Sequence, residues 1–209
     1  MTTTLPITDR TKVRRKPQRG SHERAVIDAI LDEALICHVG FATELGVVVI
    51  PTTHVRVEDD LYIHGSAASH MLRSLAHGIA VSVCVTLLDE LVLSRTAFHH
   101  SVNYRSVVMF GTATPVENTV QKLAALAALI DRVVPNRSAG CRPPNAKELA
   151  ATSVLALPIT EASAKIRSGP PLPDEGEDLA LPYWAGTIGL RTSRGTPVNA
   201  PDCKLAWPG

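Results

Sequence analysis

Short apolar segments with β-strand character follow one another closely between residues 36 and 115, and this succession most constrains the fold. In residues 79–88, valine or leucine at every second position alternates with small polar side chains, which is typical of a strand with one apolar face. Glu44-Leu45-Gly46 and Glu58-Asp59-Asp60 supply turns between further strands. Because strands and helices do not alternate regularly, a doubly wound parallel sheet is disfavoured and an antiparallel sheet is predicted.

Helical periodicity flanks these strands. Ser21 can cap a helix whose apolar face is formed by Ile27, Ile30, Leu31, Ala34 and Leu35. A short helix is expected over residues 67–77, and a longer one begins after Asn118 and ends at Pro135. The buried stripe of the longer helix is expected to consist of Val120, Leu123, Ala127, Ile130 and Val134. The sequence therefore predicts a mainly β chain with flanking helices, folded as a small antiparallel barrel of six to seven strands.

Two local signals concern the later strands. Asp89-Glu90 is expected to form the turn of a hairpin between two strands. Gly111 lies within a strand pattern, where glycine indicates a bulge or a close approach of another segment.

The chain divides into three parts by composition. Residues 1–20 carry six basic side chains between Arg10 and Arg19 and are expected to form a basic, flexible arm that is solvated or reaches an anionic ligand or partner. Residues 21–190 are expected to form one domain. Residues 191–209 are expected to form a loosely ordered tail.

Composition excludes several classes of partner. The net charge of +1 gives no electrostatic case for a nucleic acid or a membrane surface. No apolar run approaches the roughly 18 residues that a membrane span needs, and the N-terminus shows no apolar segment of a secretory signal. The four cysteines are far apart and form no C-x-x-C motif, so we expect a cytoplasmic protein without a metal site; they are Cys37, Cys84, Cys141 and Cys203.

The stretch LYIHGSAASHMLR, residues 61–73, passes from a strand into a short helix through small residues. A helix start carries unpaired N–H donors and a partial positive charge, so it can hold a phosphate without a Walker-type lysine. The candidate residues are His64, Gly65, Ser66, Ser69 and Arg73. The alternative is that the two serines only cap the helix and that His64 is a polar residue at the strand end.

Two further clusters could contact a ligand. Tyr104, Arg105 and Ser106 begin a strand and could approach a ligand lying over the barrel wall, or could face solvent. A metal site at the neighbouring His99-His100 is disfavoured, because adjacent residues of an extended chain point to opposite sides.

The segment IPTTHVR, residues 50–56, contains a proline that interrupts a strand ladder. Backbone groups beside Thr52 and Thr53 could therefore bind the polar rim of a planar ring. His54 could be a proton donor or a plain surface histidine.

These clusters, in this order, resemble the pyridoxamine 5'-phosphate oxidase-like flavin-nucleotide-binding proteins, and in particular the branch with the nitroimidazole-resistance proteins. The matching segments include VVVIPTTHVRVEDDLYIHGSAASHMLR and LVLSRTAFHHSVNYRSVVMFGTATPV, and the likeness extends over residues 21–186. The resemblance implies a split β-barrel, a homodimer, and flavin mononucleotide (FMN) bound at the subunit interface.

The resemblance also implies roles for single residues. The backbone of Ile50, Pro51, Thr52 and Thr53 would face the isoalloxazine ring. The candidate residues of the stretch 61–73 would hold the phosphate, and Tyr104, Arg105 and Ser106 would approach the cofactor from another strand. Lys165, Arg167 and Trp184 would belong to a C-terminal segment near the pocket.

Two departures from the family limit the expected activity. The tail lacks the arginine-rich ending of the true oxidases, which argues against pyridoxamine phosphate oxidation, and Gly189 stands where relatives tend to have proline. The expected activity is electron transfer from NADH or NADPH through FMN to a small oxidised acceptor. A substrate proton could come from His54, His99, His100 or solvent. The alternatives are a flavin-binding or sensing protein without turnover, and the same fold with haem or a deazaflavin.

Overall fold

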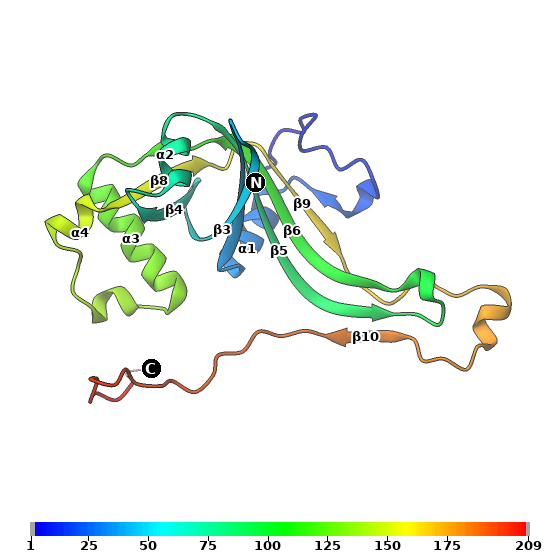
Figure 1. Ribbon diagram of the computed structural model, residues 1–209. Helices are drawn as coiled ribbons and strands as arrows, with labels where there is room; N and C mark the ends of the chain where they lie inside the picture. Colours follow the sequence, from blue (N-terminus) through cyan, green and yellow to red (C-terminus); the bar gives the residue numbers. More distant parts are fainter. Residues whose placement is uncertain (1–2, 208–209) are drawn as a thin grey trace. The chain divides into compact units, whose positions relative to one another are not determined.

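The computed structural model describes residues 3–207 and consists of two compact units (Figure 1). Unit 1 contains the chain up to Leu88 together with Val102–Gly169, and unit 2 contains Asp89–Ser101 together with the chain from Pro170 onward. Residues 1, 2, 208 and 209, which belong to the expected arm and tail, lie outside the described residues.

The sheet is antiparallel, and residues 3–207 contain ten strands. Its order is β1-β9-β6-β5-β2-β3-β4-β8-β7, and β10 pairs with the part of β5 that lies in unit 2. The strands are β1 Gly20–Ser21, β2 Ile36–Thr43, β3 Gly46–Val57, β4 Asp60–Ser66, β5 Ala80–Leu93, β6 Ser101–Thr112, β7 Thr114–Pro115, β8 Thr152–Pro158, β9 Ala162–Arg167 and β10 Gly186–Gly189.

This sheet confirms the predicted mainly β, antiparallel fold with flanking helices. The strand number exceeds the expected six to seven because β1, β7 and β10 span two, two and four residues. Segments this short carry no alternating pattern that a sequence could reveal. The predicted turns at residues 44–46 and 58–60 are confirmed, since β2, β3 and β4 follow one another across them.

Four α-helices flank the strands, with α3 and α4 on the side of β4 and β8 in Figure 1. They are α1 Arg24–Glu33, α2 His70–Ala76, α3 Thr119–Val133 and α4 Ala146–Ala150; the 3-10 helices are η1 Pro17–Arg19, η2 Ala97–His99, η3 Arg137–Gly140 and η4 Gly176–Ala180. The predicted cap at Asn118 is confirmed, because its side chain accepts a hydrogen bond of 3.0 Å from the N–H of Gln121. The cap of α1 is Glu23 rather than Ser21.

The core of unit 1 lies between the helices and the inner faces of the strands. Four of the five apolar positions expected in α1 are buried, whereas Leu35 is 44% exposed because the helix ends at Glu33 and the chain turns into β2. In α3 the expected stripe is wrong. Val120 is 76% exposed, and the buried residues are Ala125 and Leu129, which pack on Val55, Tyr62 and Val154 of the sheet. Apolar residues occur on two sides of this helix, so its periodicity does not determine which side faces the sheet.

The expected turn at Asp89-Glu90 is also wrong, because β5 continues through it to Leu93. In unit 2 this part of β5 pairs with β10, and the N–H of Leu190 donates a 2.8 Å hydrogen bond to the carbonyl of Asp89. The close approach expected at Gly111 is confirmed. A Cβ atom at this position would lie 2.8 Å from Cδ1 of Leu157.

The N-terminal segment packs against the rest of unit 1, whereas a flexible arm was expected. Leu5 and Thr11 are buried, and the N–H of Leu5 donates to the carbonyl of His22 at 2.8 Å. The hydroxyl of Thr8 donates to Glu161 at 2.5 Å, and the guanidinium of Arg10 pairs with the same carboxylate. One buried apolar side chain and two acceptor groups, the carbonyl of His22 and the carboxylate of Glu161, therefore hold a segment whose composition is that of a flexible arm.

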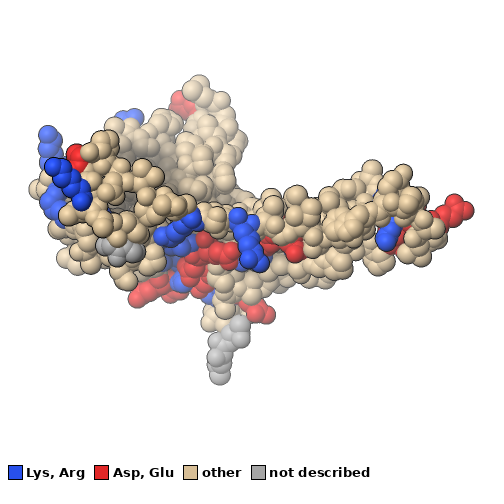
Figure 2. All heavy atoms as spheres, turned by 90° about the horizontal axis from the view of Figure 1, so that it is seen from below, with Lys and Arg blue, Asp and Glu red and all other residues tan. Residues whose placement is uncertain are grey.

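Charged groups of both signs lie next to one another on the face shown in Figure 2. This mixture agrees with the net charge of +1. Within residues 3–207, no helix has the length and apolar character needed to cross a membrane.

Candidate functional site

The main feature of the site is the point at which β3 changes its partner. β3 pairs with β2 over Gly46–Thr53 and with β4 over His54–Val57. The last pair with β4 joins His54 to Ile63, and the same register would place Thr53 opposite His64 and Thr52 opposite Gly65. The described residues form no such pairs, so the facing backbone edges of residues 50–53 and 64–66 are not used by a β3–β4 ladder. A ligand with polar groups along its rim can bind such edges.

His64 lies at this point with an unsatisfied ring nitrogen. Its side chain is half-buried, and Nδ1 is buried without a hydrogen-bond partner among the described residues. Burial lowers the pKa of His64, so the imidazole is neutral near pH 7. A buried polar atom without a partner is costly, and a ligand that hydrogen-bonds to Nδ1 would remove that cost.

Ser69 caps α2, whereas Ser66 forms a local contact with a residue that precedes the helix. Ser69 is the N-cap and accepts from the N–H of Leu72 at 3.5 Å, while the hydroxyl of Ser66 accepts from the N–H of Ala68 at 3.2 Å. Both hydroxyls act as acceptors in these contacts, so their O–H groups are still able to donate to an anion. Arg73 is exposed one turn further along α2.

On β3, the candidate residues 50–53 differ in exposure. Pro51 is exposed and lies directly across from His38, while Ile50, Thr52 and Thr53 are half-buried. Residues 50–53 and 64–66 thus lie on the two strands that stop pairing beyond the His54–Ile63 pair.

The third cluster is engaged elsewhere. Arg105 forms a two-pronged ion pair with Glu33 at the end of α1, with Nη2 2.7 Å from Oε1. Ser106 donates to the carbonyl of Lys165 at 3.2 Å, and Tyr104 lies across from Arg167 in the β6–β9 pair. These contacts hold β6 to α1 and β9 and do not join it to residues 50–53 or 64–66.

The expected C-terminal residues fall into different units. Arg167 is buried in unit 1 and donates to the side chain of Asn103, which in turn donates to the carbonyl of Gly169 at 2.9 Å. Trp184 is an exposed residue of unit 2. His99 and His100 also belong to unit 2, where both contact Thr96.

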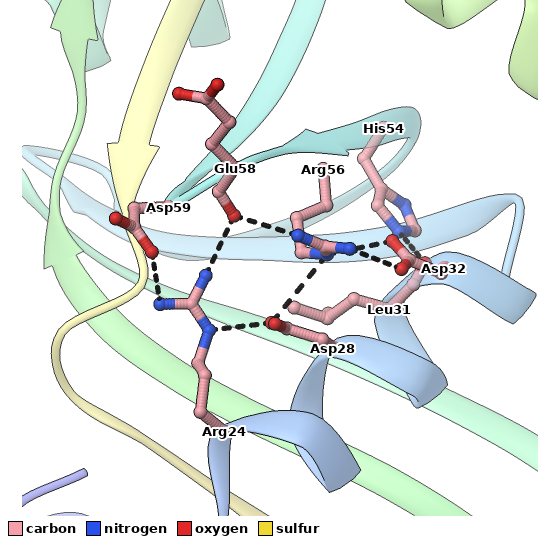
Figure 3. Close-up of polar contacts among 8 residues, drawn as sticks. All are labelled: Arg24, Asp28, Leu31, Asp32, His54, Arg56, Glu58 and Asp59. Carbon is pink, nitrogen blue, oxygen red and sulfur yellow. Dashed lines mark hydrogen bonds and ion pairs between the residues drawn. The ribbon is translucent and has the colours of Figure 1, made fainter. Parts of the chain in front are cut away.

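Figure 3 shows that His54 is neither a surface histidine nor an accessible proton donor. Its side chain is 1% exposed, and Nε2 lies 3.0 Å from the carbonyl oxygen of Leu31. Because a carbonyl only accepts, Nε2 carries the proton and donates it. Burial lowers the pKa of His54, although this hydrogen bond acts in the opposite direction. His54 therefore fixes β3 to the last turn of α1, directly beside Thr53.

The same figure shows a network of ion pairs that reinforces this contact. Arg56 binds Asp32 with Nε 2.9 Å from Oδ1, and Arg24 binds Asp28 with Nε 2.7 Å from Oδ1. Both arginines also donate to the carbonyl of Glu58 in the turn between β3 and β4. The β3–β4 hairpin is thus held to α1 on the side away from the open edges.

One feature of unit 1 was missed by sequence reasoning. A groove of about 450 Å³ lies over β2, β3 and β5. Its floor includes His38, Gly40 and Ala42 from β2, flanked by Val47 and Val49 from β3. The small residues at alternate positions of β2 and β5 were the signal, but they indicate only a face without bulky side chains.

The chain is similar to a known family over most of its length. The family model described as pyridoxamine 5'-phosphate oxidase matches residues 23–166. A search of curated proteins gives no match.

Several solved structures are similar to this chain, and three of them illustrate the range of similarity. The FAD and heme binding protein from Mycobacterium smegmatis has 40% identity and a TM-score of 0.84, covering 88% of this chain and 90% of its own. The flavocytochrome Anf3 from Azotobacter vinelandii has 37% identity and a TM-score of 0.86, covering 95% and 94%. A candidate 5-nitroimidazole antibiotic resistance protein from Bacteroides thetaiotaomicron has 19% identity and a TM-score of 0.58, covering 70% and 86%, and supports the fold alone.

Proposed function

Because the chain belongs to the pyridoxamine 5'-phosphate oxidase family, we propose that it binds a flavin nucleotide where β3 separates from β4. The observation that carries the proposal is the combination of open backbone edges with the unsatisfied Nδ1 of His64. The residues present fit a flavin, whose ring has polar atoms along its rim and whose phosphate requires several N–H and O–H donors.

Each part of the site would hold a different part of the flavin. Backbone groups of Ile50, Pro51, Thr52 and Thr53 would face the isoalloxazine ring. The phosphate would be held by His64, Gly65, Ser66, Ser69 and Arg73. Tyr104, Arg105 and Ser106 would approach from β6, which requires Arg105 to exchange Glu33 for the cofactor. Following the family resemblance, FMN is the proposed nucleotide, bound at the interface of a homodimer.

A bound flavin would carry electrons from NADH or NADPH to a small oxidised acceptor. The chain supplies binding and orientation, and none of its side chains has to act as a nucleophile. The neutral imidazole of His64 can donate or accept one hydrogen bond at Nδ1, which fixes the position of the ligand rather than its reactivity. All four cysteines are free thiols, which supports the proposed cytoplasmic location.

A second candidate function is favoured by a specific observation. The two solved structures with 40% and 37% identity are described as a FAD and heme binding protein and a flavocytochrome. Each of them covers 88% or more of this chain. We therefore also propose that the protein carries a haem in addition to its flavin, and that the flavin is then FAD.

The absorption spectrum of the purified protein separates these functions. A flavin band alone supports the first candidate, a flavin band with a Soret band supports the second, and neither band after incubation with FMN, FAD and hemin refutes both. Chromatography of the released cofactor identifies FMN or FAD. Bleaching by NADH or NADPH with recovery in air supports electron transfer, and its absence supports a binding protein without turnover.

The phosphate assignment predicts a loss of flavin affinity when Ser66 and Arg73 are changed together to alanine. Each lost hydrogen bond to a charged group should weaken binding about tenfold to hundredfold. The matched control replaces Ser193 and Arg191, which belong to unit 2 and to none of the proposed contacts. Fluorescence titration with FMN and FAD measures both variants, and equal affinities would refute the assignment.

A further inference from the structure

We propose that the groove over β2, β3 and β5 is the haem site and that His38 is the protein ligand of the haem iron. This inference rests on the second proposed function, the binding of a haem. It adds where the haem lies and which side chain binds the iron.

The floor of the groove is a regular grid formed by the outward-facing residues of three neighbouring strands. The register places Gly40 between Val49 and Ser82, and it places His38 between Pro51 and Cys84. With strands about 4.8 Å apart, three strands give a floor about 10 Å wide. A floor of this width can support one face of a planar molecule.

The walls of the groove are apolar, although they face solvent. Val47 and Val49 are 78% and 62% exposed, and Phe110 of β6 closes another side. Large apolar side chains that line an exposed groove together are typical of a ligand site rather than of an ordinary surface. A porphyrin combines a large apolar plane with two carboxylates, so it matches such walls better than a polar cofactor does.

His38 can bind the iron because nothing else occupies its imidazole. The side chain of His38 is exposed at the groove and forms no hydrogen bond or ion pair within the described part of the chain. Haem iron receives four nitrogen ligands from the porphyrin, so one histidine from the protein is sufficient. That requirement agrees with the finding that residues 3–207 contain no group of three or more His, Cys, Asp or Glu able to hold a free metal ion.

The other seven histidines are less suitable. His22 and His54 contact backbone carbonyl groups, and His99 and His100 contact Thr96 in unit 2. His64 lies at the proposed flavin site, and none of these five lines the groove. The remaining two, His70 and His77, belong to α2 and its C-cap and do not line the groove either.

Cys84 is the competing ligand, because it lies directly across from His38 on β5. A thiol has to lose its proton before it binds iron, whereas a neutral imidazole binds as it is. Arg10 lines the groove and could hold a haem carboxylate. Its Nε lies 3.1 Å from Glu161, and its guanidinium has further N–H donors.

The location also brings the two proposed cofactors close together. His38 is the cross-strand partner of Pro51, which belongs to the proposed flavin segment of β3. Directly opposed residues of an antiparallel pair have Cα atoms about 5 Å apart. A haem bound to His38 would therefore lie beside the strand that contacts the flavin.

The test uses the full chain titrated with hemin, comparing wild type with His38→Ala and with the control His77→Ala. We expect His38→Ala to weaken hemin binding at least tenfold and to change the Soret band, and added imidazole to restore the wild-type band. His77→Ala should keep the wild-type spectrum. The flavin-to-protein ratio should be equal in all three proteins, which also shows that the variants fold.

Several results would overturn the assignment. An unchanged spectrum and affinity in His38→Ala would refute the role of His38 while leaving the haem function intact. A thiolate-type spectrum of the carbon monoxide complex that disappears in Cys84→Ser would assign the iron to Cys84 instead. If the wild-type protein binds flavin but no hemin, the haem function fails together with this inference, and the flavin function stands.

Discussion

Acidification below pH 6.5 should weaken the fold through the buried imidazole of His54. Burial lowers the pKa of His54 in the folded chain, whereas the unfolded chain keeps the ordinary value of 6.5. Between these values the unfolded state binds more protons than the folded state. The stabilisation is therefore complete above pH 6.5 and is lost as the pH falls toward the folded pKa. At pH 5.5 the loss is at most about 1.4 kcal/mol, since the pH then lies one unit below the unfolded pKa.

Among the other groups with shifted pKa values, His64 acts in the same direction as His54, and Glu148 titrates below this pH range. His64 also has a lowered pKa, but its side chain is half-exposed and solvent screens part of the effect. The pKa of Glu148 is lowered from 4.5 to about 2 by its contacts with Arg142 and Asn145, so its contribution is lost only between those values. The range from pH 6.5 to 5.5 therefore excludes Glu148, and a variant of His54 is needed to separate His54 from the remaining groups.

The assay compares wild type with His54→Gln by urea unfolding at pH 7.5, 6.5 and 5.5, with the cofactor content held equal. A glutamine amide can still donate to the carbonyl of Leu31, but it does not titrate. We expect wild type to lose about 1 kcal/mol more than His54→Gln between pH 7.5 and 5.5. The same pH dependence in both proteins would show that His54 does not control acid sensitivity.

Two further predictions test the packing. Gly111→Ala places a Cβ 2.8 Å from Cδ1 of Leu157 and should destabilise the fold by about 1–3 kcal/mol. The control Gly195→Ala, whose Cβ would have no atom within 4 Å, should have little effect. Equal thermal stability of the two variants would refute the close approach. Leu129→Ala should cost about 2–5 kcal/mol and Val120→Ala less than about 0.5 kcal/mol in urea unfolding. The reverse order would show that the other side of α3 faces the sheet.

The sequence predicted those features that depend on neighbouring residues. The turns at residues 44–46 and 58–60 and the helix start at Asn118 each require only a few adjacent side chains, and all three are confirmed. The alternation in residues 79–88 likewise follows from the pleat of a single strand. Such signals are independent of the rest of the chain.

Three of the errors have a common physical cause, because each depends on a distant segment. Asp89-Glu90 resembles a turn, but β10 supplies a strand partner about 100 residues later. The buried side of α3 depends on which face of the sheet it covers. The sequence favoured a surface position for His54, whereas the fold places the carbonyl oxygen of Leu31 beside its ring. The residues next to each of these positions in the sequence do not identify such distant partners.

β3 connects the features of the proposed site because its side chains alternate between two environments. Val47 and Val49 line the groove, while Val48 and Ile50 pack on the core and His54 contacts α1. Its backbone changes partner between Thr53 and His54, which creates the open edge. A single strand thus supplies one wall of the proposed haem groove, the edge of the proposed flavin site and the contact with α1. If both proposals hold, β3 would contribute to the positions of both cofactors.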